Sequence, residues 1–218
     1  MEFIEAKTIL TKVKGSESWY GIDYNMNLYK GCSHGCIYCD SRSNCYQIKN
    51  FNIVRGKLNA ISTLERELSR KEKGVIGMGS MSDPYNPQEK KYEMTRDALK
   101  LIQKYNYGVS IDTKSDLVLR DIDCIKEIRK KNNVIVKFTI TTASDELSKK
   151  IEPHVCPSSK RFAAIKELSD NGIFVGIMIN PVLPFITDSA ENIRSLVRLA
   201  HENGAKFIHT YMSMTWRD

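Results

Sequence analysis

Gly31 to Arg42 reads G-C-S-H-G-C-I-Y-C-D-S-R, and Cys32, Cys36 and Cys39 within it have the spacing C-x₃-C-x₂-C. Thiolates this close together, in a loop with a glycine between them, can bind one metal centre, either a zinc ion or an iron–sulfur cluster. A structural zinc site usually has four ligands, and no second paired block of cysteines follows this one. Three cysteines on a four-iron cluster would leave one iron open to another ligand, and this open iron favours a catalytic role.

Length and composition are those of an ordinary globular chain. The 218 residues, 41% hydrophobic and 27% charged, suit one domain with a substantial core. We expect residues 1–22 to be a polar lead-in and residues 23–218 to be the core domain. No apolar run is long enough to span a membrane, and residues 1–10 lack the layout of a signal peptide. We therefore expect a cytoplasmic protein without a membrane partner, in a compartment where clustered cysteines more often bind metal than form disulfides.

The formal net charge is +7, and a basic surface can attract nucleic acid through its phosphates. The lysines, however, are spread along the chain in short runs mixed with acidic residues, as at 71–73 and 89–91. Such runs are usually solvated faces or lie at helix ends. Charge therefore leaves nucleic acid as one candidate partner without selecting it.

Apolar periodicity predicts that strands and helices alternate along the chain. This alternation indicates a parallel sheet with helices packed outside it, and polar groups at the ends of the strands favour an open β/α barrel. Periodicity by itself does not separate such a barrel from a doubly wound sheet. The six core strands are predicted at 23–29, 74–80, 108–113, 133–142, 173–180 and 205–212, after a first strand near 3–10. Helices are predicted at 59–70, 92–105, 121–131, 161–171 and 190–202.

The cysteine spacing, with Tyr38 directly before Cys39, resembles the signature of the radical S-adenosylmethionine (radical SAM) enzymes. In that family three cysteines hold a [4Fe–4S] cluster, and SAM binds the fourth iron. An electron from the cluster cleaves SAM to a 5′-deoxyadenosyl radical, which abstracts hydrogen from the substrate. The resemblance implies a [4Fe–4S] cluster and SAM as cofactors, a reductant such as flavodoxin or ferredoxin, and a partial (β/α)₆ TIM-type barrel, here ending just after its sixth strand.

A longer set of motifs, beginning with G-S-M-S-D-P-Y-N-P at 79–87, resembles the subgroup around spore photoproduct lyase, also described as DNA repair photolyase-like. Several residues would contact SAM if the resemblance holds at each position. Ser82 would lie near the amino group of SAM, and Lys114 near its carboxylate and ribose. Arg161 would either bind a carboxylate or pair with Glu152, and pairing is the preferred interpretation. The remaining expected contacts are Thr139 to the ribose, and Tyr38 and Asn180 to the adenine.

One position departs from the subgroup. Spore photoproduct lyases carry a cysteine at the end of the second strand, whereas this chain has Ser80, whose O–H bond is too strong for the same hydrogen-atom donation. The substrate therefore stays open, with nucleic acid as one candidate. The alternative to an enzyme is a non-catalytic module that binds metal or nucleic acid through a structural cysteine site. His34 and Cys45 are not expected to be metal ligands. Cys124 and Cys156 belong to a helix and a loop elsewhere, and they are not expected to take over the hydrogen-atom donation.

Overall fold

Parallel strands form the centre of the fold, as the alternation predicts. The computed structural model describes residues 1–13 and 21–210. Its main sheet has the strand order β10-β9-β8-β7-β6-β3-β2. All neighbouring strands in it are parallel except β2 and β3, which are antiparallel. The strands are β2 Leu10–Lys12, β3 Tyr24–Met26, β6 Val75–Met78, β7 Gly108–Thr113, β8 Val134–Thr139, β9 Val175–Ile179 and β10 Ile208–Thr210.

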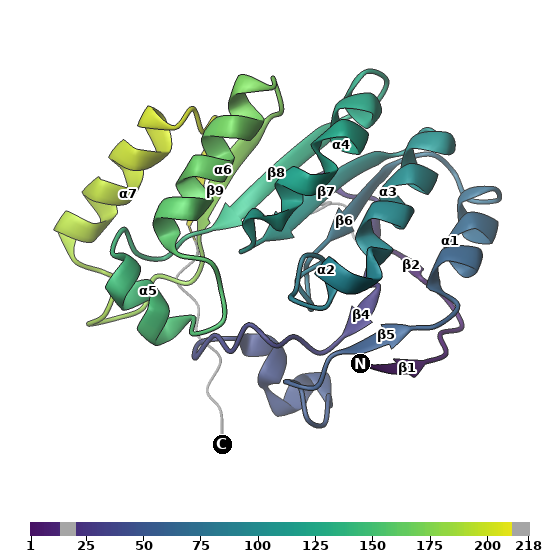
Figure 1. The fold of residues 1–218 in the computed structure, drawn as a ribbon, viewed down its shortest axis with the longest axis horizontal. Coiled ribbons are helices and arrows are strands. Elements are labelled where there is room, and N and C mark those ends of the chain that lie inside the picture. The colour runs from purple at the N-terminus through teal and green to yellow at the C-terminus, as the bar shows by residue number, and fades with distance from the viewer. Residues whose placement is uncertain (14–20, 211–218) are drawn as a thin grey trace.

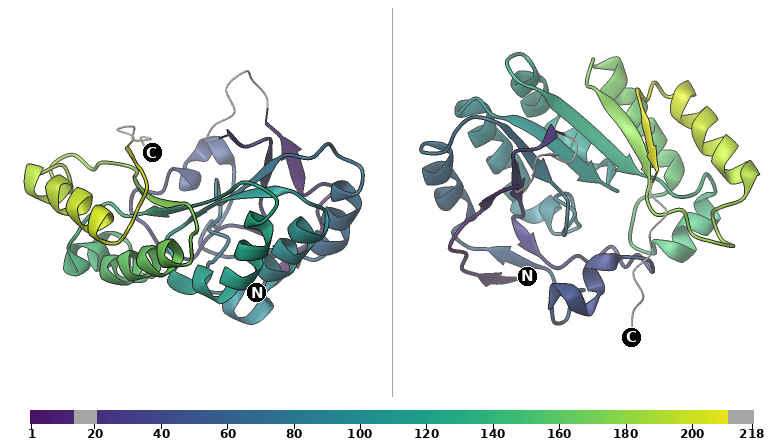
Figure 2. Two further views of the ribbon diagram at one scale, coloured as in Figure 1. Left: turned by 90° about the horizontal axis from the view of Figure 1, so that it is seen from above. Right: turned by 180° about the vertical axis from the view of Figure 1, so that it is seen from behind.

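The longer helices all pack on one face of this sheet (Figures 1 and 2). Each of them returns the chain so that the next parallel strand can start from the same edge. Two shorter helices, α2 Glu89–Tyr92 and α5 Asp145–Ile151, follow the carboxyl ends of β6 and β8. The longer helices are α1 Ala60–Leu68, α3 Met94–Lys104, α4 Ile122–Arg129, α6 Ser158–Asp170 and α7 Ala190–Glu202.

The two faces of the sheet differ in chemistry because successive side chains of a strand point to opposite faces. The face toward the helices carries fully buried aliphatic residues such as Ile111 and Val136. On the other face, Asp112 of β7 lies opposite Lys137 of β8, and their side chains form an ion pair with an Nζ–Oδ1 distance of 2.8 Å. Helices on one face and polar groups on the other are the arrangement of a partial barrel. The expected fold class is confirmed.

The amino-terminal residues are built into the sheets. A second, small sheet has the order β1-β5-β4, with β1 Glu2–Ile4, β4 Tyr29–Lys30 and β5 Arg55–Lys57. The single strand predicted near 3–10 is wrong, because the chain there forms β1 and then β2, which join different sheets. The predicted strand 23–29 is likewise divided into β3 and β4. The described part of residues 1–22 therefore pairs with the core, and its status as a separate lead-in stays a prediction.

Three further differences concern helices and ends. The predicted helix 92–105 is interrupted at Glu93, whose φ of 48° separates α2 from α3. The helix α5 was not predicted, and a 3₁₀ turn at Asp116–Asp121 precedes α4. The predicted strand 205–212 is observed as β10, and residues 211 and 212 lie outside the described residues. Among the described helices, none is long and apolar enough to cross a membrane.

Candidate functional site

The cysteine loop lies between β4 and β5, beyond the carboxyl end of β3. Cys32 and Cys36 are buried, with 8% and 6% of their surface exposed, and Cys39 is half-buried. All three thiols are free, as are the other cysteines. The chain continues through two 3₁₀ turns, Asp40–Arg42 and Asn44–Tyr46, before it returns to β5. The fold thus holds the three expected ligands in one loop.

Two glycines allow this loop to pack closely against the rest of the chain. Gly31 has a φ of +84°, and a Cβ atom there would lie 2.5 Å from the carbonyl oxygen of Phe51. Gly35 has a φ of +76°, and its Cβ would lie 3.0 Å from Cγ of Pro153. Both positions combine a left-handed backbone with a close approach, which only glycine tolerates without strain. The glycines next to the cysteines are therefore required by the shape of the loop.

Backbone and side-chain hydrogen bonds fix the loop from two sides. The N–H of Ile37 donates to the carbonyl of Ile151 at 2.9 Å, and the N–H of His154 donates to the carbonyl of His34 at 3.1 Å. From the end of β6, the Ser82 hydroxyl donates to the carbonyl of Gly31 at 2.6 Å. Ser82 is therefore at the site, where its hydroxyl anchors the loop, and its contact with SAM stays a prediction.

Asp83 connects three parts of the site. Its Oδ1 accepts a hydrogen bond from the Thr113 hydroxyl at 2.8 Å, and its Oδ2 accepts one from the backbone N–H of Lys114 at 2.7 Å. Oδ2 also lies 3.4 Å from Nδ1 of His34 in the cysteine loop. Burial of His34 lowers its pKa, although the carboxylate of Asp83 opposes this. Asp83 belongs to the motif at 79–87, but its role in connecting three parts of the site was not predicted from the sequence.

Lys114 follows directly after β7 and reaches toward the cysteine loop. Its Nζ lies 5.7 Å from the centre of the Tyr38 ring, a distance that allows a cation–π interaction. Burial acts to lower the pKa of Lys114, but the neighbouring Cys36, Glu152 and Asp83 outweigh burial and raise it. The ammonium group therefore stays charged beside the thiols, as the expected contact with an anionic carboxylate requires.

A buried ion pair supports the other side of the loop. The side chains of Arg161 and Glu152 are fully buried and in direct contact. The guanidinium also donates to the carbonyl of Thr139 at 2.6 Å and to the Ser148 hydroxyl at 2.7 Å, and the Tyr38 hydroxyl donates to Glu152. Burial acts to raise the pKa of Glu152, but Arg161 and Lys114 outweigh it and lower this pKa. The preferred pairing of Arg161 with Glu152 is confirmed.

The last two expected contacts lie at strand ends. Thr139 ends β8, and Asn180 follows β9 and is half-buried. Ser80, at the corresponding end of β6, has an exposed side chain. The expected residues thus gather at the carboxyl edge of the sheet with the cysteine loop, where barrel enzymes place their active sites. Direct contact of each with SAM stays a prediction.

The donor set suits an iron–sulfur cluster. Burial raises the pKa of Cys32 to about 11 and that of Cys36 to about 12, so these thiols need a metal to become thiolates at neutral pH. Across residues 1–13 and 21–210, no group of three or more His, Cys, Asp or Glu side chains is arranged around a point where it could hold a metal ion. In a [4Fe–4S] cluster each thiolate binds a different iron, so its ligands need not converge on one point.

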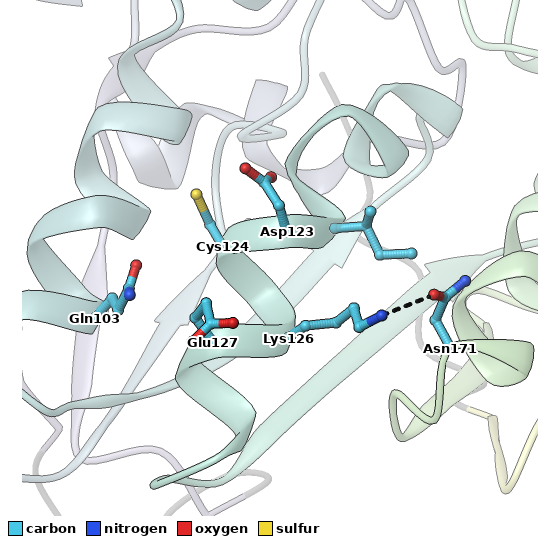
Figure 3. Close-up of a pocket in the computed structure, with 7 residues that line it drawn as sticks. Gln103, Asp123, Cys124, Lys126, Glu127 and Asn171 are labelled. Atoms are coloured by element: carbon cyan, nitrogen blue, oxygen red, sulfur yellow. Dashed lines mark hydrogen bonds between the residues drawn. The ribbon is translucent and has the colours of Figure 1, made fainter.

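A hollow of about 380 Å³ lies elsewhere, on the helical layer (Figure 3). Lys126 of α4 crosses it and donates to Oδ1 of Asn171 at 3.2 Å. Cys124 also lines it, which places this cysteine on a helix outside the cysteine loop. None of the expected site residues lines this hollow, so it is separate from the candidate site.

The fold and the loop together define a partial-barrel protein with a three-cysteine site at the carboxyl edge of its sheet. The radical SAM superfamily model matches residues 26–200, and the chain belongs to this superfamily. A protein of Methanocaldococcus jannaschii, Uncharacterized protein MJ0683, is 39% identical over 173 residues, which are 77% of this chain and 63% of that protein. The chain therefore spans less than two thirds of this relative's length.

Solved structures of spore photoproduct lyase have the same fold. The lyase complexed with dinucleoside spore photoproduct superposes with a TM-score of 0.70 at 16% identity, over 94% of this chain and 59% of the lyase. A lyase mutant with bound AdoMet and dinucleoside spore photoproduct gives a TM-score of 0.66, also at 16% identity, over 87% of this chain and 55% of that one. This similarity concerns the fold.

Proposed function

We propose that the chain is a cytoplasmic radical SAM enzyme whose Cys32, Cys36 and Cys39 hold a [4Fe–4S] cluster. When bound, the cluster and SAM together supply a 5′-deoxyadenosyl radical that abstracts a hydrogen atom from the substrate. The observation that carries the proposal is the loop itself: three free thiols, held in a fixed backbone beside the charged Lys114, at the carboxyl edge of a barrel. A low-potential protein such as flavodoxin or ferredoxin is the proposed reductant.

The chain's own residues would hold and orient SAM. Lys114 offers an ammonium group for the carboxylate of SAM, and Asp83 fixes the backbone of Lys114. The ion pair of Glu152 and Arg161 holds Tyr38 through its hydroxyl, which supports the proposed contact of the Tyr38 ring with the adenine. Thr139 and Asn180 complete the proposed contacts from the ends of β8 and β9.

Nucleic acid is the proposed substrate class to test first. Support comes from the net charge of +7 and from the lyase of similar fold, which was solved with a dinucleoside photoproduct. The serine at position 80 argues against the same overall reaction, because it cannot return a hydrogen atom as a thiol does. Nucleic acid is therefore proposed only as a substrate class. The substrate radical is expected to react further in a different way from that in the lyase.

The test is anaerobic reconstitution with iron and sulfide, followed by electron paramagnetic resonance of the reduced protein with and without SAM. A [4Fe–4S]⁺ signal that changes when SAM is added, together with 5′-deoxyadenosine in the product mixture, supports the proposal. Cys32→Ala should abolish the signal, whereas Cys124→Ala, at a cysteine outside the loop, should retain it. Stoichiometric zinc, or a cluster whose signal does not change when SAM is added, would contradict the enzyme proposal. Either result would favour a non-catalytic module with a structural cysteine site.

A further inference from the structure

The longer helices cover only one side of the main sheet (Figure 2), and the other side carries a group of side chains that the proposed SAM contacts do not include. β7 contributes Ser110 and Asp112 to this group, and β8 contributes Lys137. Phe174 directly precedes β9, and Phe207 directly precedes β10. We call these five residues the inner-face cluster.

Strand register and one glycine bring the cluster together. Lys137 of β8 lies opposite Asp112 on one side and opposite Gly176 on the other. The Phe207 ring lies directly over Gly176, because a Cβ atom at that position would be only 2.5 Å from the ring. Phe174 and Phe207 are stacked, with ring centroids 5.5 Å apart and planes inclined by 18°. The aromatic pair therefore lies beside the ion pair, on the same face of the sheet.

The ion pair presents its carboxylate and hides its ammonium group. The side chain of Lys137 is 2% exposed and that of Asp112 is 26% exposed, with 2.8 Å between Nζ and Oδ1. A phosphate would meet the carboxylate first and be repelled. A cationic ligand would gain little, because Lys137 and the nearby Lys114 already act on the charge of Asp112. The exposed carboxylate therefore suits a neutral N–H or O–H donor.

Two further features favour a planar ligand. Phe174 has 48% of its surface exposed and Phe207 is half-buried, so this stacked pair offers an apolar surface to another ring. Ser110 is buried, and the described residues supply no hydrogen-bond partner for its hydroxyl. A buried hydroxyl without a partner costs free energy, and a polar ligand on this face can supply that partner. The cluster thus combines an aromatic surface with two polar groups.

The cluster lies next to the residues that are proposed to bind SAM. Lys114 follows Asp112 by two residues along the chain, and Thr139 follows Lys137 by two. Two residues of a strand span about 7 Å. A ring bound on the cluster would therefore lie close to the proposed SAM contacts, on the side toward the amino ends of the strands.

We propose that the inner-face cluster binds one nucleobase of a nucleic-acid substrate. The base stacks against Phe174 and Phe207, and one of its N–H groups donates to the carboxylate of Asp112. This inference rests on the proposed function and deepens it, because it names the part of the nucleic acid that enters the barrel. A base in a single strand, or one turned out of a duplex, can be recognised through its π face and its hydrogen-bonding edge.

The experiment compares two fluorescein-labelled single-stranded DNA oligonucleotides of equal length. One carries all four bases, and the other is abasic at its central positions, so that it keeps the phosphates but lacks the ligand of the cluster. Binding to the reconstituted protein with SAM is measured by fluorescence anisotropy, with the cluster kept oxidised.

The variants are chosen to leave the attraction to phosphates unchanged. Asp112→Asn/Lys137→Met removes the ion pair of the cluster without changing the net charge. The control, Glu65→Gln/Lys104→Met, removes an ion pair of 2.7 Å from the helical layer, again without changing the net charge. Phe174→Ala removes an exposed ring and is therefore expected to fold normally. It decides the test if the double variant of the cluster proves unstable in thermal unfolding.

We expect the unaltered protein to bind the base-containing strand about tenfold more tightly than the abasic strand. Asp112→Asn/Lys137→Met and Phe174→Ala should each lose most of this preference, while their affinity for the abasic strand stays the same. The Glu65→Gln/Lys104→Met protein should keep the preference. All the proteins should retain the change of the cluster's electron paramagnetic resonance signal on addition of SAM.

Four results would overturn the nucleobase site. They are equal binding of the two strands by the unaltered protein, an unchanged preference in the folded cluster variants, an equal loss in the helical-layer control, and equal weakening of both strands. The last of these would indicate a contact with the phosphates instead. A cluster whose signal does not change when SAM is added would overturn the proposed function. The two proposals therefore fail by different measurements.

Discussion

Replacing Arg161 by methionine tests whether this residue supports the fold of the site or binds SAM. Arg161 and Glu152 are completely buried, and the guanidinium makes further hydrogen bonds of 2.6 and 2.7 Å to the carbonyl of Thr139 and the hydroxyl of Ser148. Arg161→Met would leave the carboxylate of Glu152 buried without its main partner. Removing one member of a buried pair costs about 3–5 kcal/mol of unfolding free energy. For a chain of this size, this corresponds to a melting temperature lower by roughly 6–20 °C.

The assay is urea and thermal unfolding of the cluster-free protein, so that cofactor binding does not contribute. Glu152→Leu and the double variant complete a double-mutant cycle, and the double variant should be less destabilised than Arg161→Met, because it leaves no uncompensated charge. A loss below about 1 kcal/mol for Arg161→Met, or single effects that simply add, would refute the reasoning. Intact stability with weakened SAM binding would instead assign Arg161 to the cofactor.

The same pair predicts a pH dependence. The pKa of Glu152 is lower in the folded protein than its ordinary value of 4.5. Its contribution to the free energy of unfolding is therefore fully present above pH 4.5 and is lost as the pH falls through the folded pKa. In Arg161→Met, burial dominates and raises the pKa of Glu152, so that the variant loses stability as the pH rises. The stability difference between the two proteins should therefore be smaller near about pH 4 than at neutral pH, as unfolding at both pH values would show.

Three further perturbations follow from the site and the backbone. Gly35→Ala should lower the iron content after reconstitution, because the added Cβ meets an atom 3.0 Å away. The control is Gly21→Ala, at a φ of +67° with nothing within 4 Å of the added Cβ. It should cost about 1–2 kcal/mol of stability and leave the iron content unchanged. Asp83→Asn can place an amide N–H against the backbone N–H of Lys114, and we expect SAM affinity, measured by calorimetry, to fall about tenfold through loss of one charge-assisted hydrogen bond. Phe185 is 99% exposed with a φ of +63°, so Phe185→Gly should raise the stability by up to about 1 kcal/mol, and a lower melting temperature would show that its ring packs usefully.

The cysteine loop and the parallel sheet could be predicted because their signals are local. The three thiols lie close in sequence, and each strand–helix unit carries its own periodicity. The helix α5 was missed because its seven residues are mostly polar, although Ser144 before it caps it by accepting a hydrogen bond from the N–H of Leu147 at 3.2 Å. A serine followed by acidic residues is a start signal that could have indicated a short helix there.

What sequence reasoning did not find depends on contacts between distant segments. The pairing of Glu2 with Arg55 in the small sheet joins residues 53 positions apart. Asp83 is joined to His34 and Lys114 only because the sheet brings the ends of β6 and β7 next to the cysteine loop. An aspartate at the end of a predicted barrel strand is a general sign of a site residue, and it could have marked Asp83 as more than a turn residue.

The hydrogen bonds that join the cysteine loop to the end of β6 and to residues 151–154 involve none of the sulfur atoms of Cys32, Cys36 and Cys39. They come from Ser82 at the end of β6 and from residues 151–154 after α5, and the two crowded glycines leave the loop little freedom to adopt another path. The order of assembly follows from this. For the proposed cluster, we expect the chain to complete its folding before iron and sulfide arrive and to receive a preassembled cluster as the last step of maturation. A cluster destroyed by oxygen could then be rebuilt in place without unfolding the protein.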